Sequence, residues 1–173
     1  HGSNPREFFT IDERRRLREA VLDMDSIPHY KSVSPEQRRE WKKYLAQRLH
    51  KPVDDITPED WAEVRGWKYP SIIHTALDAG LRPCEVGRAT VGWVDVDNNC
   101  LRIPKEEASK STDNWVVALR QQTAEILGNW LRERAQYPKY DDTDALWLTR
   151  ESNPYSPSSL KTLVVNACEA AEI

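Results

Sequence analysis

The 173-residue sequence lacks any apolar run that approaches the ~20 residues of a membrane-spanning helix, and it shows no secretory signal pattern. Its three cysteines, Cys84, Cys100 and Cys168, are odd in number and scattered, so they indicate neither a disulfide framework nor a metal site. We therefore expect a cytoplasmic protein with reduced thiols, no membrane contact, no bound metal and no cofactor.

A strong net charge is also missing. The 25 Lys and Arg residues are outnumbered by 28 Asp and Glu residues, which gives a formal charge of -3 at pH 7. Nucleic-acid-binding proteins are usually basic, so the overall charge counts against such a role. The charge is uneven, however, because residues 1–50 hold 11 basic and 8 acidic side chains, whereas residues 51–173 hold 14 and 20. DNA contact depends on a local basic surface, so the mean charge decides little.

Helix signals dominate the first part of the chain. Capping residues followed by helix-forming sequence predict helix starts at Thr10, Ser34 and Thr57. Residues 70–79 are typical of a buried helix, and Gly80 is a natural stop because glycine accepts the left-handed conformation. We expect a sharp chain reversal at Arg82, after which Pro83 opens another short helix.

The pattern changes after Val91. Residues 93–96 and 100–103 flank a polar turn and predict a β-hairpin, and residues 115–119 alternate as a third strand. Two amphipathic helices follow, one through Ile126 and Arg134 and the last from Ser156 onward. Helices, then a small sheet, then helices indicate an α+β fold that is mostly helical, with a three-stranded antiparallel sheet.

Three sequence features occur in order along the second half. Gly-Leu-Arg-Pro-Cys-Glu, residues 80–85, lies between two predicted helices. The predicted sheet follows, with a lysine-bearing polar loop at residues 105–113 between its second and third strands. Thr149-Arg150-Glu151 then precedes Ser156-Pro157 and the last helix.

This ordered set resembles the tyrosine recombinase (phage integrase) family, in which Gly-Leu-Arg-x-x-Glu is followed by a sheet with a hairpin lysine. The resemblance covers residues 5–173, is sharpest from Ala76 onward, and looks archaeal in its Gly-Leu-Arg-Pro form. Residues 1–4 resemble an expression-tag remnant, and residues 5–173 are interpreted as the front part of a catalytic domain. Residues 26–69 are longer than the family pattern leads us to expect and are interpreted as a helical insertion.

The resemblance implies phosphoryl transfer, in which a tyrosine hydroxyl attacks a DNA phosphodiester and forms a phosphotyrosine intermediate. Arg82 matches the first of the family's two arginines, whose planar guanidinium binds two phosphate oxygens at once. Lys110 is the best match to the lysine that protonates the leaving 5′ oxygen, and Lys105 is the second choice. Glu85 lies one helical turn beyond Arg82, where it would orient the guanidinium. Lys105 and Arg150 are candidates for further DNA contacts.

Each of these residues also has a plainer interpretation. Alone, Arg82 is typical of a surface arginine, Lys110 of a solvated loop, and Glu85 of an acid in the first turn of a helix. Arg150 either contacts a backbone phosphate or faces solvent. The run Arg14-Arg15-Arg16 with Arg18 is either a solvated helix face or a strip that follows DNA phosphates.

The family's His-x-x-Arg motif and nucleophilic tyrosine have no match in the sequence. The histidines are His1, His29, His50 and His74, and none has an arginine three residues later. Tyr155 lies before the place of the second arginine, so it does not match the nucleophile. We therefore expect that the chain stops before these residues and that it cannot cleave or rejoin DNA alone.

The sequence therefore predicts part of a site-specific DNA recombinase whose partner is double-stranded DNA. By the resemblance, the parent protein is a tetramer on DNA, and this part of it is a monomer. Two alternatives stay open. The missing nucleophile favours a non-catalytic DNA-binding integrase remnant or regulator, whereas the charge of -3 and the Trp-rich capped helices favour a helical interaction scaffold.

Overall fold

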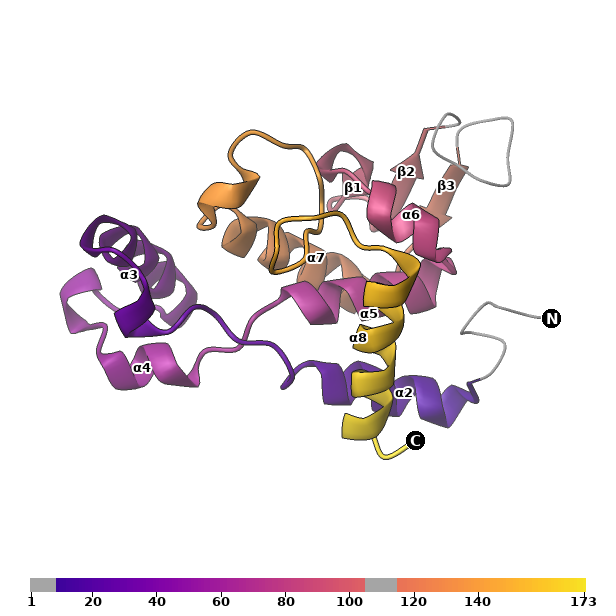
Figure 1. Ribbon diagram of the computed structural model, residues 1–173, viewed down its shortest axis with the longest axis horizontal. Coiled ribbons are helices and arrows are strands. Elements are labelled where there is room, and N and C mark those ends of the chain that lie inside the picture. Colours follow the sequence, from indigo (N-terminus) through magenta and orange to yellow (C-terminus); the bar gives the residue numbers. More distant parts are fainter. Residues whose placement is uncertain (1–8, 105–114) are drawn as a thin grey trace.

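The computed structural model describes residues 9–104 and 115–173, which form a mostly helical protein with one small sheet (Figure 1). The α-helices are α2 (Ile11–Val21), α3 (Pro35–Leu49), α4 (Pro58–Glu63), α5 (Lys68–Ala79), α6 (Pro83–Arg88), α7 (Gln121–Arg134) and α8 (Pro157–Ala170). Short 3-10 helices are η1 (Tyr30–Ser32), η2 (Val53–Asp55), η3 (Val91–Trp93) and η4 (Pro138–Tyr140). The predicted α+β class is confirmed.

The sheet has three strands, β1 (Val94–Asp95), β2 (Cys100–Ile103) and β3 (Trp115–Ala118), in the order β1-β2-β3. Both pairings are antiparallel. The predicted hairpin and third strand are therefore present, but β1 is shorter than the predicted residues 93–96, because Trp93 lies in η3.

Helix starts follow the capping signals. The side chains of Thr10, Ser34 and Thr57 each accept a hydrogen bond from the backbone N–H three residues later, and that later side chain accepts from the cap in return. Ser156 and Ser159 make the same reciprocal pair at α8. Because each pair satisfies two backbone donors that the helix leaves open, these starts are local properties of the sequence.

The larger of two hydrophobic cores lies between α2, α5, α7, α8 and the sheet. In this body α5 packs against α2 and α7, and α2 packs against α8. Fully buried indoles fill it, and their polar edges have partners: Trp130 Nε1 donates to the Leu146 carbonyl at 2.9 Å, and Trp147 Nε1 donates to Ser71 Oγ at 2.9 Å. A buried Trp contributes large apolar area here without leaving its N–H unsatisfied.

The smaller core belongs to α3 and α4, which lie at one end of the molecule in Figure 1. Its members are Ile27, Trp41, Tyr44, Leu45, Ala46, Ile56, Trp61 and Val64. The chain enters and leaves this unit at one point, where Ser26 forms a β-bridge with Arg65 and Gly66 N–H donates to the Asp25 carbonyl at 3.2 Å. The interpretation of residues 26–69 as an insertion stays a prediction, and this common entry and exit agrees with it.

Among the described residues, no helix is both long and apolar enough to cross a membrane.

Candidate functional site

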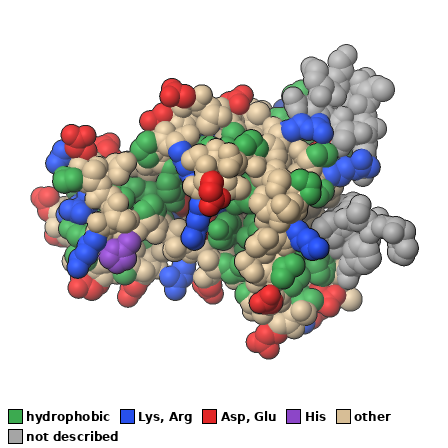
Figure 2. Space-filling model, in the orientation of Figure 1, with side chains coloured by type: hydrophobic (Ala, Val, Ile, Leu, Met, Phe, Trp, Pro, Cys, Tyr) green, Lys and Arg blue, Asp and Glu red, His purple; other side chains and the backbone are tan. Residues whose placement is uncertain are grey.

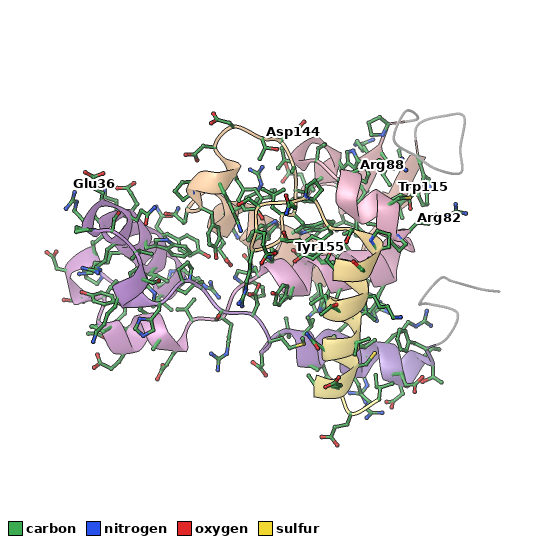
Figure 3. All side chains as sticks on the ribbon, in the orientation of Figure 1. Glu36, Arg82, Arg88, Trp115, Asp144 and Tyr155 are labelled. Atoms are coloured by element: carbon green, nitrogen blue, oxygen red, sulfur yellow. The ribbon has the colours of Figure 1, made fainter. Side chains whose placement is uncertain are left out.

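Arg82 lies at the reversal between α5 and α6. Gly80 ends α5 in the left-handed conformation, at φ 65° and ψ 39°, and its N–H donates to the Ala76 carbonyl at 2.9 Å. Two residues later Arg82 is the N-terminal cap of α6, with an exposed side chain. Figure 3 shows this side chain at the edge of the molecule that also carries Arg88 and Trp115. The chain therefore presents the Arg82 guanidinium to the outside instead of enclosing it.

Glu85 fixes the backbone at this point. It is fully buried, and its Oε1 accepts the Arg82 backbone N–H at 2.7 Å. This contact matches the plainer interpretation of Glu85 as a first-turn acid, because a carboxylate there satisfies an open amide of the helix start. Glu85 thus positions Arg82 through its main chain, and orientation of the guanidinium by Glu85 stays a prediction.

The backbone of α6 lies close to the segment before α8, and this contact supports the Arg82 site. A side chain at Gly87 would clash with the Tyr155 carbonyl oxygen, so only glycine lets these two backbones meet. The Tyr155 ring is buried, the Lys68 ammonium lies 5.5 Å from its centroid, and burial raises the pKa of its hydroxyl. A buried phenol with a raised pKa is a poor nucleophile, which agrees with the absence of a match between Tyr155 and the family's nucleophile in the sequence.

The predicted lysines, Lys110 and Lys105, lie outside the described residues. Ile103 of β2 and Trp115 of β3, which flank that segment, are paired in the sheet. Figure 3 draws Trp115 at the Arg82 edge, and β3 packs against α5, the helix that leads to Arg82.

Arg150, a candidate from the sequence, lies at a second basic site, a cavity of about 180 Å³. Sequence reasoning did not find this cavity. Arg150 is exposed, makes no hydrogen bond with any residue that the structure describes, and shares the cavity with Lys68 and Lys139. The two lysines donate to the carbonyls of Leu148 and Thr149, both at 3.0 Å.

Lys68 is the most perturbed base of this cavity. Its side chain is buried, and burial lowers its pKa to about 8. The buried Asp25 carboxylate also lines the cavity, and it accepts the backbone N–H groups of Ser26 and Tyr69 at 2.8 and 3.1 Å. No local sequence signal marks Lys68, because its neighbours in the cavity, apart from Tyr69, come from segments about 40 to 80 residues away.

The arginine run on α2 divides into different roles. Arg15 pairs with Asp12 and Glu19 at 2.6 and 2.7 Å on the exposed face. Arg16 donates to the carbonyls of Ala171 and Glu172 at 2.8 and 2.9 Å, which joins α2 to the end of α8. Neither sequence interpretation, a solvated face or one phosphate strip, describes the whole run.

Basic side chains are present at the Arg82 edge. In Figure 2, blue side chains stand at the edge where Figure 3 labels Arg82 and Arg88, and further blue side chains lie among red ones toward the α3–α4 end of this face. Within residues 9–104 and 115–173, no group of three or more His, Cys, Asp or Glu side chains is arranged to hold a metal ion.

Comparison with known proteins gives two findings. The model of the phage integrase family matches residues 56–173. The fold is similar to the crystal structure of XerA recombinase, with a TM-score of 0.59 and 16% sequence identity over 95% of this chain. That alignment covers 42% of the XerA recombinase chain, so the present chain spans about two fifths of its length. No curated protein sequence matched.

Proposed function

Because the chain belongs to the phage integrase family of tyrosine recombinases, we propose that it is the DNA-binding part of a site-specific recombinase and that Arg82 contacts the scissile phosphate. One observation carries this proposal. Arg82 is exposed, while Gly80 and the buried Glu85 fix its backbone from both sides. A cationic donor that is fixed before the substrate arrives loses little conformational freedom on binding, as phosphoryl transfer requires.

The guanidinium of Arg82 suits the chemistry of the family. Negative charge builds up on the phosphate oxygens in the transition state, and a planar guanidinium can donate to two of them. By the resemblance, Lys110, or Lys105 as second choice, would protonate the leaving 5′ oxygen. Arg150, with Lys68 and Lys139 behind it, would contact a backbone phosphate away from the scissile bond.

The nucleophile is proposed to come from outside these 173 residues. The sequence holds no His-x-x-Arg motif, and Tyr155 is buried with a raised pKa. We expect this chain, as a monomer, to bind DNA without cleaving it, and the parent protein to act as a tetramer.

DNA binding by this chain tests the proposal. Fluorescence anisotropy with a labelled 30-base-pair duplex should give an affinity that falls steeply with salt, because phosphate contacts release counterions. Arg82→Ala should weaken binding about tenfold, on the scale of one lost charge-assisted contact. Arg39→Ala, which removes an exposed arginine of α3, is the charge-matched control and should change little. Equal effects of the two variants would count against Arg82 as the phosphate contact.

Catalysis is tested in a protein that carries the His-x-x-Arg motif and the tyrosine downstream of this sequence. Such a protein should form covalent adducts with its cognate site, and Arg82→Ala and Lys110→Ala should abolish them. The missing nucleophile also supports a second candidate, a non-catalytic DNA-binding regulator. A reading frame that ends at Ile173, together with salt-dependent DNA binding, would select this candidate.

A further inference from the structure

Three arginines surround one aspartate at the end of α5, four residues before Arg82. The Asp78 side chain is 3% exposed. Arg14 and Arg18 approach from α2, and Arg120 approaches from the residue that precedes α7. Together they line an open hollow of about 260 Å³, to which Leu77 and Ala118 add the remaining walls. We call this feature the arginine hollow.

Both oxygens of Asp78 are already used. Oδ1 accepts from Arg18 Nη2 at 2.9 Å, and Oδ2 accepts from the Arg120 backbone N–H at 3.0 Å. The Arg120 side chain is 62% exposed and only reaches 3.9 Å, from Nε to Oδ1. One carboxylate therefore faces three guanidinium groups, and the hollow keeps an excess of two positive charges.

Arg18 is an unusual arginine because its charged group is almost enclosed. Its side chain is 9% exposed, and its buried Nε has no acceptor. Burial lowers the pKa of this guanidinium, and the neighbouring charges of Arg120 and Arg14 act in the same direction. Of the five N–H donors of an arginine, only one is directed to Asp78, so the group retains donors for another acceptor.

The Arg14 side chain has no hydrogen-bond or ion-pair partner among the residues that the structure describes, although it is half-buried. Its neighbours in the sequence differ in this respect. Arg15 is neutralised by two carboxylates, and Arg16 is bound to two carbonyls. Half-buried cations without counter-charges repel one another, and a bound anion relieves that repulsion.

We propose that the arginine hollow binds a phosphate group, and that its source is a backbone phosphate of the DNA outside the cleavage point. The assignment of this phosphate to DNA rests on the proposed function, whereas the ability to bind a phosphate group rests on the hollow alone. Three arginines line the hollow, and planar guanidinium groups can donate to the oxygens of a phosphate. The volume exceeds that of several waters, each about 30 Å³ in the liquid, so a phosphate fits. The hollow, with Arg14, Arg18 and Arg120, then positions the duplex next to Arg82.

The test compares two charge-matched double variants. Arg14→Gln with Arg120→Gln removes the two accessible guanidinium groups and leaves the Arg18–Asp78 pair in place. Arg15→Gln with Arg39→Gln removes two exposed arginines elsewhere and is the control. Each protein is titrated with inorganic phosphate, followed by the arginine side-chain NMR signals, and with a 30-base-pair duplex at several salt concentrations.

The proposal expects phosphate to shift the signals of Arg14, Arg18 and Arg120. It expects the hollow variant to lose about 10–100-fold in DNA affinity. The slope of log affinity against log salt should fall by about 0.9, the contribution of one phosphate contact. The control should lose clearly less. If phosphate shifts these signals but the two variants bind DNA alike, the hollow binds free phosphate and the DNA source is overturned.

Two further outcomes separate this inference from the proposed function. Equal DNA binding by both variants, with no phosphate response at Arg14, overturns the hollow and leaves the role of Arg82 intact. Phosphate binding at the hollow in a protein that binds no DNA overturns the proposed function and leaves the hollow as a phosphate site.

Discussion

The two cores of this protein are built and used differently. The larger body is mostly aliphatic between its buried indoles, and it carries Arg82, the arginine hollow and the sheet. The α3–α4 unit is centred on aromatic side chains in contact, with Trp41 at 5.6 Å from Tyr44 and 6.0 Å from Trp61. Every predicted site residue that the structure describes lies on the larger body. The proposed chemistry therefore belongs to this body, and the α3–α4 unit is attached to it.

A small set of polar contacts joins the two. Glu133 of α7 accepts the Trp67 backbone N–H at 2.8 Å and the Tyr137 hydroxyl at 2.6 Å. The Tyr137 ring lies 5.3 Å from Trp41 and 6.1 Å from Trp130, so it contacts both cores. A junction of this kind is a place where a unit can open without unfolding the body.

The largest effect is expected from Trp147→Ala in the body. This indole is 1% exposed, and its loss leaves a cavity and removes the hydrogen bond that Ser71 Oγ accepts. We expect a loss of about 3–5 kcal/mol in the free energy of unfolding, measured by urea denaturation. Trp115→Ala, at a half-buried strand position, is the control with a smaller loss. A loss of less than about 1 kcal/mol for Trp147→Ala would contradict the role of this indole in the core of the larger body.

Trp41→Ala should act on the smaller core alone. Hydrogen exchange should show lost protection in α3 and α4, while α5 and α7 keep theirs, because sub-global units open separately. DNA binding through Arg82 should be retained. If α5 loses protection together with α3, the two cores form one cooperative unit and the comparison fails.

The junction should respond to pH through Glu133. Burial raises the pKa of this carboxyl from 4.5 to about 7, so the folded protein holds a proton that the unfolded chain has released. Stability contributed by this group is complete below about pH 4.5 and is lost as the pH rises to about 7.

Glu133→Gln removes this titration. Its stability relative to the parent chain should therefore rise between pH 4.5 and 7, by up to about 3 kcal/mol, measured by urea denaturation at each pH. Glu125→Gln, on the exposed face of the same helix, is the control and should show no such trend. If the stability difference between Glu133→Gln and the parent chain does not change with pH, the Glu133 carboxyl is ionised in the folded protein.

The smallest effect concerns how the main helices of the two units end. Helix α3 ends in His50 at φ 56°, whereas α5 ends in Gly80 at φ 65°. Because only glycine adopts this conformation without strain, His50→Gly should add about 0.5–1 kcal/mol of stability, and Gly80→Ala should remove about 1 kcal/mol. Thermal unfolding measures both, and changes of the same sign would contradict the explanation.

The amino-acid sequence by itself determined the helix starts, the stop at Gly80 and the place of the β-hairpin, since each depends on residues within a few positions of one another. It also placed Arg82 at the reversal, because a helix stop and Pro83 flank it. The assignment of Lys110 and Lys105 stays a prediction from the resemblance.

Only the tertiary structure decided which charged groups act together. The Arg14–Arg16 run with Arg18 is uniform in sequence, yet Arg15 is neutralised on its own helix, while Arg18 pairs with Asp78, 60 residues away. Lys68 meets the Leu148 carbonyl across 80 residues, and Glu133 meets Trp67 across 66. Such pairs form when helices pack, and the burial that packing imposes changes the pKa of each group, so no local pattern could have shown them.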